Sequence, residues 1–113
     1  MQTVSITNLV AEQLDLAHKG TRGRAAHTIY GGSDQRLRQT VLALVAGTEL
    51  AEHESPGEAT LQVLHGHVEL TAGAESWTGE TGELVTIPPE RHALTARTDA
   101  VILLTVSKAE VGA

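Results

Sequence analysis

His53 and His92 are the two side chains of this sequence with the clearest chemical use. A neutral imidazole is a common ligand for divalent transition metals, and it also donates and accepts hydrogen bonds in small-molecule sites. General-base catalysis is the weaker interpretation, because no carboxylate is placed to orient either ring. A purely structural role, with both rings satisfied by hydrogen bonds, stays open beside metal binding and ligand binding.

His65 and His67 form a second pair, at the spacing that places two side chains on one face of a strand. Gly66 marks a bend between them, and Val68 and Leu70 occupy the apolar face of the segment that follows. Alternation along that segment turns His67 outward. We therefore expect two solvent-facing histidines at a turn rather than a metal site.

Two glycine-led motifs frame the candidate residues. The first runs from Gly47 through five residues to His53, and then through a Pro-Gly turn into an apolar strand. The second runs from Gly82 through five residues to Pro88, and His92 follows shortly after it. In this order the two motifs resemble the conserved motifs of the cupin family.

The resemblance covers residues 36–106 and implies an all-β fold, the cupin jelly-roll barrel or double-stranded β-helix. In that fold the two motifs are pairs of antiparallel strands that face each other. The resemblance implies a small single-domain cupin in which residues 1–35 supply an N-terminal helix and a leading strand. Residues 36–113 then form the cupin barrel, and the whole chain is one structural domain.

The same resemblance implies where a metal would bind, and the motif is incomplete there. Family ligands are the two histidines of a His-x-His pair, one glutamate and the histidine of the second motif. This chain supplies His53 and His92, but Ser55 and Ala59 stand where the second histidine and the glutamate would be. Glu58 is one residue away, which on a strand is the opposite face. Because a durable site needs three or four protein ligands, we expect a degenerate site with little or no metal.

Binding of a small apolar or anionic molecule inside the barrel, as a sensor or carrier, is therefore the favoured function. The residues predicted to contact the ligand are His53, Ser55, Gln62, Arg91 and His92. The alternative is a metal-dependent enzyme of the dioxygenase or isomerase type, in which His53 and His92 hold zinc, nickel, iron or manganese with atypical ligands. A structural or interaction module is a further alternative, and whether the protein is an enzyme stays open.

A scaffold of short strands must position these residues. The sequence predicts a helix over residues 7–19, capped by Thr7 or Asn8 and stopped at Gly20. Beyond it, runs rich in Val, Ile, Leu and Thr alternate with Gly, Pro and acidic residues, which is typical of a β-sandwich or barrel. The predicted strands are residues 25–30, 37–45, 59–64, 67–71, 74–78, 84–87, 92–96 and 100–106.

Charge and composition restrict the partners. The chain of 113 residues has a net charge of −6 at pH 7, which argues against nucleic acid because that binding depends on Lys and Arg neutralising phosphates. No apolar run is long enough to span a bilayer, so we expect no membrane partner. The absence of cysteine and of a signal-like start fits a cytoplasmic protein. The basic residues that lean toward the N-terminal third form a solvated rim or, less favoured, an anion-binding patch: Lys19, Arg22, Arg24, Arg36 and Arg38.

Strand edges predict self-association. A short open barrel must cover its edges, and the N-terminal segment with Val4 and Ile6 suits this purpose. We therefore expect a homodimer that meets through an outward aliphatic face.

Overall fold

Strands dominate the computed structural model, which describes residues 1–53 and 57–108. Within these residues the chain forms one helix and nine strands. They are α1 (Ile6–Lys19), β1 (Arg24–Tyr30), β2 (Leu37–Leu44), β3 (Glu49–His53), β4 (Gly57–His65), β5 (His67–Ala72), β6 (Glu75–Glu80), β7 (Leu84–Thr86), β8 (His92–Ala96) and β9 (Ala100–Lys108).

The helix α1 begins one residue earlier than the sequence predicts, and its cap is Ser5 rather than Thr7 or Asn8. The Ser5 hydroxyl oxygen accepts a hydrogen bond from the Asn8 backbone N–H at 3.2 Å, which satisfies one of the open donors of the first turn. The predicted caps were wrong because both residues already lie inside that turn. The helix stops as expected at Gly20, whose N–H donates to the Leu16 carbonyl oxygen at 3.0 Å. Among the described residues, no helix has the length and apolar character that a membrane crossing requires.

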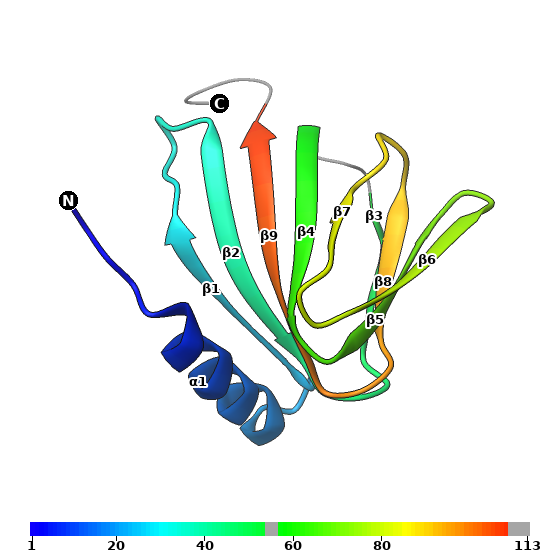
Figure 1. Ribbon diagram of the computed structural model, residues 1–113, viewed down its shortest axis with the longest axis horizontal. Coiled ribbons are helices and arrows are strands. Elements are labelled where there is room, and N and C mark those ends of the chain that lie inside the picture. Colours follow the sequence, from blue (N-terminus) through cyan, green and yellow to red (C-terminus); the bar gives the residue numbers. More distant parts are fainter. Residues whose placement is uncertain (54–56, 109–113) are drawn as a thin grey trace.

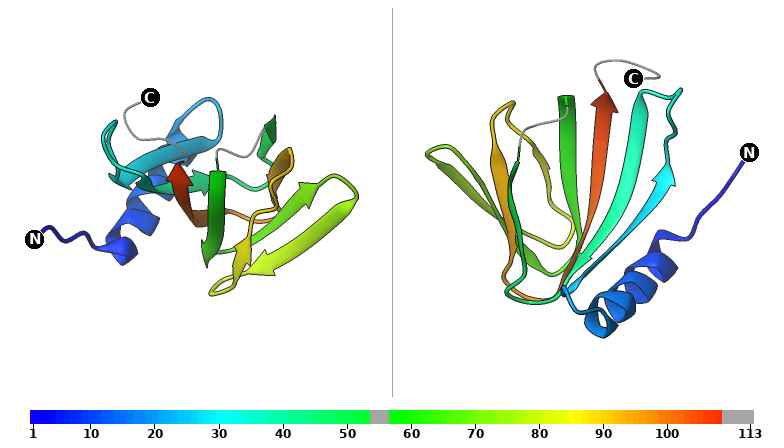
Figure 2. Two further views of the ribbon diagram at one scale, coloured as in Figure 1. Left: turned by 90° about the horizontal axis from the view of Figure 1, so that it is seen from above. Right: turned by 180° about the vertical axis from the view of Figure 1, so that it is seen from behind.

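The strands form two antiparallel sheets that face each other (Figure 1). The five-stranded sheet has the order β1-β2-β9-β4-β7, and the four-stranded sheet has the order β3-β8-β5-β6. The helix α1 packs on the outside of the five-stranded sheet, against β1 and β2 (Figure 2). The two sheets converge at one end and spread apart at the other (Figure 1). We call the spread end the barrel mouth; it holds the starts of β2, β4 and β8 and the ends of β3, β7 and β9.

This architecture confirms the predicted all-β, two-sheet fold with a short N-terminal helix. Eight predicted strands are present, β8 with the predicted bounds and the other seven with ends shifted by one or two residues, and β3 is the strand that the sequence pattern missed. Its sequence, ELAEH, has no β-branched residue and two glutamates, which are depleted in strands. It is a strand because its backbone pairs with β8, a long-range contact that local propensity does not report.

Apolar side chains fill two cores, one on each face of the five-stranded sheet. On β2, Leu42 and Leu44 point between the sheets, while Val41 and Ala43 point under α1. The inner core between the sheets consists mainly of the buried residues Leu44, Leu61, Val63, Val68, Leu70, Ile87, Leu94, Ala96, Ala100 and Ile102. The outer core consists of Leu9, Ala17, Val41, Ala43 and Val101. This alternation decides which side chains of each strand face the barrel interior.

Candidate functional site

His53 and His92 meet at the barrel mouth. Their Cα atoms are direct partners across the antiparallel pair of β3 and β8, so the structure brings the two predicted histidines to neighbouring positions. His53 is described by its backbone alone, and Ser55 lies outside the described residues. The adjacency follows from the pairing of the two motif strands that the sequence resemblance implies.

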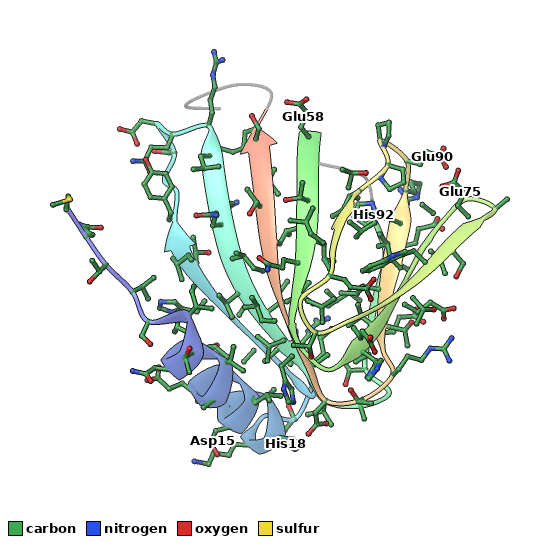
Figure 3. The ribbon with its side chains drawn as sticks, viewed as in Figure 1. Asp15, His18, Glu58, Glu75, Glu90 and His92 are labelled. Atoms are coloured by element: carbon green, nitrogen blue, oxygen red, sulfur yellow. The ribbon has the colours of Figure 1, made fainter. Side chains whose placement is uncertain are left out.

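The His92 ring is buried and fixed in orientation. It is 5% exposed and shares its face of β8 with Leu94 and Ala96, which belong to the inner core. Its Nδ1 lies 3.0 Å from the Glu90 carbonyl oxygen. A carbonyl can only accept, so Nδ1 carries the proton and the neutral ring has Nε2 as its acceptor. Figure 3 shows His92 between the two sheets and Glu90 beside it at the mouth.

Ala59, which the motif resemblance aligns with the family glutamate, faces the barrel interior. It packs against the inner core, and the cross-strand register places it opposite Val106 of β9. Glu58 is exposed on the other face, at the start of β4 (Figure 3). A one-residue step reverses the direction of the side chain, so Glu58 does not replace the missing ligand.

Metal-ligating groups are too few in the part of the site whose side chains are described. Within residues 1–52 and 57–108, no group of three or more His, Asp or Glu side chains could hold a metal ion. The mouth supplies the His92 imidazole and the Glu58 and Glu90 carboxylates there, but a durable site needs three or four protein ligands that converge on one ion. Among the side chains that are described, the structure therefore shows no set of metal ligands at the mouth.

A cavity of about 640 Å³ opens beside these residues, between the start of β4 and the segment that links β7 to β8. Its lining consists of Gly57, Glu58, Ala59, Thr60, Thr86, Ile87, Pro89, Glu90 and Arg91. The cavity exists because β7 is short. The Ile87 N–H still donates to the Ala59 carbonyl oxygen at 3.0 Å, and then Pro88 and Pro89, which lack N–H groups, lead the chain away from β4.

Arg91 lies at the rim of this cavity and is engaged by β3. Its Nε donates to Glu52 Oε1 at 3.1 Å, and its Nη2 donates to the Glu52 carbonyl oxygen at 3.3 Å. Both side chains are more than half exposed, so this ion pair adds little to stability. The Glu52 carboxylate does offset the positive charge of Arg91, which the sequence suggested as a contact for an anionic ligand.

Gln62 is not brought to the mouth histidines. Its register partners are Leu84 and Leu103, and it alternates with Leu61 and Val63 of the inner core. Its side chain therefore lies on the outer face of the five-stranded sheet. The ligand-binding role predicted for the other residues stays a prediction.

His65 and His67 are exposed at the end opposite the mouth, as the sequence indicated. The Nε2 of His67 lies 3.1 Å from Glu80 Oε2 on the neighbouring strand. These rings form part of a polar surface.

Sequence reasoning missed the relation of Arg38 to this site. It assigned Arg38 to a basic rim, but the register of β2 and β9 places this residue opposite Val106, in the same cross-strand row as Ala59. The signal was available in the alternation of residues 37–45, where Leu42 and Leu44 share the parity of Arg38.

Comparisons with known proteins identify the class. No family model matches the sequence, and no curated protein matches it. A conserved Streptococcus pyogenes protein of unknown function has a similar structure, with a TM-score of 0.74 and 28% identity over 98% of this chain and 93% of that chain. A cupin superfamily protein from Desulfitobacterium hafniense has a TM-score of 0.69 and 14% identity over 75% of this chain and 77% of that chain.

Salicylate 1,2-dioxygenase from Pseudoaminobacter salicylatoxidans, in a structure with gentisate adducts, is also similar. Its TM-score is 0.73, with 26% identity over 89% of this chain and 31% of that chain. This chain thus spans about a third of the dioxygenase. The protein has the cupin fold in a small single domain, which is the fold that the two sequence motifs imply.

Proposed function

We propose that the protein binds a small organic molecule at the barrel mouth, with little or no metal. The carrying observation is the cavity of about 640 Å³, whose volume lies within the usual range of small-molecule sites. Ala59, Ile87 and Pro89 contribute apolar side chains to its lining, and Glu58, Glu90 and Arg91 contribute charged ones. An apolar pocket with a few polar groups is the usual composition of such a site.

His92 follows the lining residues Glu90 and Arg91 directly in the chain, and we propose it as the polar anchor of the ligand. The hydrogen bond from Nδ1 to Glu90 fixes the His92 ring, so a ligand does not have to order it. His53 lies directly opposite on β3. We propose that this pair fixes the orientation of the ligand by hydrogen bonds, as a sensor or carrier requires.

Salicylate is the first probe, because it is the substrate in the name of the similar dioxygenase. Amide shifts of ¹⁵N-labelled protein should move on titration at Ala59, Ile87 and His92, with and without a chelator. Elemental analysis of the untagged protein should find well under one transition metal per chain. Near-stoichiometric metal that is lost in His53→Ala would refute the metal-poor assignment.

A metal-dependent dioxygenase is the second candidate, favoured by the 26% identity to salicylate 1,2-dioxygenase. Oxygen consumption with salicylate after anaerobic loading with ferrous iron tests it. A rate that vanishes in His92→Ala and persists in the surface variant His67→Ala would favour this candidate. The absence of any rate above the iron-only blank would refute it.

We also propose a homodimer through the outer face of β9, β4 and β7. Gln62, Leu84 and Leu103 are neighbours there, and Leu84 is 58% exposed. A two-fold interface sets residues near their own copies, so an interface centred on the uncharged Gln62, Leu84 and Leu103 avoids the repulsion that an acidic face would suffer. Sedimentation should give a dimer for the wild type and a monomer for Leu84→Glu, and a monomeric wild type would contradict the proposal.

A further inference from the structure

Arg38 lies on the face of β2 that lines the barrel. The strand pairs with β9 without a register shift from Leu37 to Leu44, so alternate residues keep one direction throughout. Leu42 and Leu44 on this face contact the inner core. Arg38 shares their parity, and therefore its side chain leaves the sheet on the same side.

The cross-strand row that contains Arg38 crosses the mouth. Val106 of β9 is the Cα partner of Arg38 on one side and of Ala59 on the other. Val106 is buried, and Ala59 lines the cavity. Two strand spacings separate Arg38 from Ala59, about 10 Å between backbones. Arg38 thus stands at the same level of the barrel as the cavity, with apolar side chains between them.

The guanidinium of Arg38 has no hydrogen bond or ion pair with any other residue within 1–52 and 57–108. Arg91 and Arg97, in contrast, are paired with Glu52 and Glu69. Arg38 is exposed, and no carboxylate of the described residues neutralises it on the barrel-facing side of β2. Its charge is therefore available to a ligand.

Gly31 fixes the backbone from which Arg38 extends. Its φ of +119° lies in the region that favours glycine. A Cβ at this position would lie 2.9 Å from the Leu37 carbonyl oxygen and 3.0 Å from the Arg38 Cα. The connection from β1 thus packs directly on the first residues of β2, which holds Arg38 in register.

We propose that Arg38 binds the anionic group of the mouth ligand, and that this ligand is a small carboxylate with an apolar body. A guanidinium matches a carboxylate with two parallel hydrogen bonds, and such charge-assisted pairs are stronger than neutral ones. Ala59, Ile87 and Pro89 of the cavity lining then contact the apolar body. This inference rests on the proposed binding function and assigns its ligand class.

Benzoate and benzyl alcohol form a matched pair of probes, because they share a ring and differ in charge. The test titrates each into the ¹⁵N-labelled full chain and follows the amides of Ala59 and Val106. Arg38→Gln should weaken benzoate at least about tenfold, the usual effect of removing a charged hydrogen-bond partner. Benzyl alcohol should change less than twofold. Arg38→Lys should retain part of the benzoate affinity, because it keeps the charge and loses the planar fork.

Arg22→Gln is the matched control. It removes the same charge from an exposed turn before β1, at the closed end of the barrel, and should leave both affinities within twofold. Benzoate affinity that is equal in Arg38→Gln and wild type would overturn the role of Arg38 while leaving the binding function intact. If neither probe moves the mouth amides of the wild type, the binding function itself fails, and this inference fails with it.

Discussion

Asp99 joins three parts of the closed end of the barrel, and its removal should loosen all of them. Its Oδ1 accepts a hydrogen bond from the Ala46 N–H at 2.9 Å, which ties the turn before β9 to the connection after β2. Its Oδ2 lies 2.6 Å from Nε2 of His18 in the last turn of α1. The variant Asp99→Ala removes both contacts without adding bulk.

The loss can be estimated from the two contacts. The bond to Ala46 resembles an N-cap bond, and losing it costs about 1 kcal/mol of unfolding free energy. The His18 pair is half exposed and adds about 0.5 kcal/mol. A total near 1.5 kcal/mol lowers the melting temperature by about 6 °C in a domain of this size, at about 4 °C per kcal/mol.

The effect should depend on pH in one direction. The Ala46 N–H and the His18 ring hold the pKa of Asp99 below its ordinary value, and the charge of His65 lowers it further. Because the folded pKa lies below the unfolded value of about 3.9, the stabilisation is fully present above that value. It is lost as the pH falls through the folded pKa. The difference between wild type and Asp99→Ala should therefore narrow below about pH 4.

Thermal unfolding followed by circular dichroism between pH 3 and pH 8 measures both effects. Asp15→Ala is the control, because Asp15 forms an exposed ion pair with Lys19 within α1 and its loss should cost less than about 0.5 kcal/mol. A decrease for Asp99→Ala no larger than that of the control, or one that stays constant down to pH 3, would refute the reasoning.

Three further predictions concern single positions. Gln13→Leu should raise the unfolding free energy by about 1 kcal/mol in urea titrations, because Gln13 lies on the buried face of α1 and its Oε1 has no hydrogen-bond partner among the described residues. The exposed Glu12→Leu should not raise it. Gly66→Ala should cost about 3 kcal/mol, because its φ is +90° and a Cβ would overlap the Asp99 carbonyl oxygen, whereas Gly47→Ala, with similar φ and open space, should cost about 1 kcal/mol. Ala59→Glu should raise zinc affinity about 10–100-fold in isothermal titrations, and Thr60→Glu, which points to the other face, should leave it unchanged.

The pattern of apolar residues predicted the strands whose side chains are buried on both faces. On β2 and β9, Val, Ile and Leu occupy the core positions except Ala43 and Ala100, so periodicity and propensity agree. The pattern failed at β3, whose glutamates and alanine carry no strand preference. That strand owes its existence to pairing with β8, and pairing is a property of the folded chain.

The sequence likewise predicted some residues of the candidate site and missed others. The positions of His53 and Ala59 followed from motif spacing, because spacing along paired strands fixes which residues meet. Gln62 was expected near them, but parity with Leu61 and Val63 places its side chain outside. Arg38 was overlooked because its neighbour Val106 is 68 residues away in the sequence, so the row that joins them appears only in the sheet.

The charges at the mouth favour an anionic ligand over a metal cation. The position where the family carries a glutamate has only the methyl group of Ala59, and the same row keeps the guanidinium of Arg38. A divalent cation there would lack an anionic ligand and would face a positive charge about 10 Å away in a site of reduced dielectric constant. A bound carboxylate would instead be attracted by the positive charge of Arg38. The variant Ala59→Glu should therefore weaken benzoate binding while it strengthens zinc binding, because the new carboxylate repels an anion and attracts a cation in the same cross-strand row.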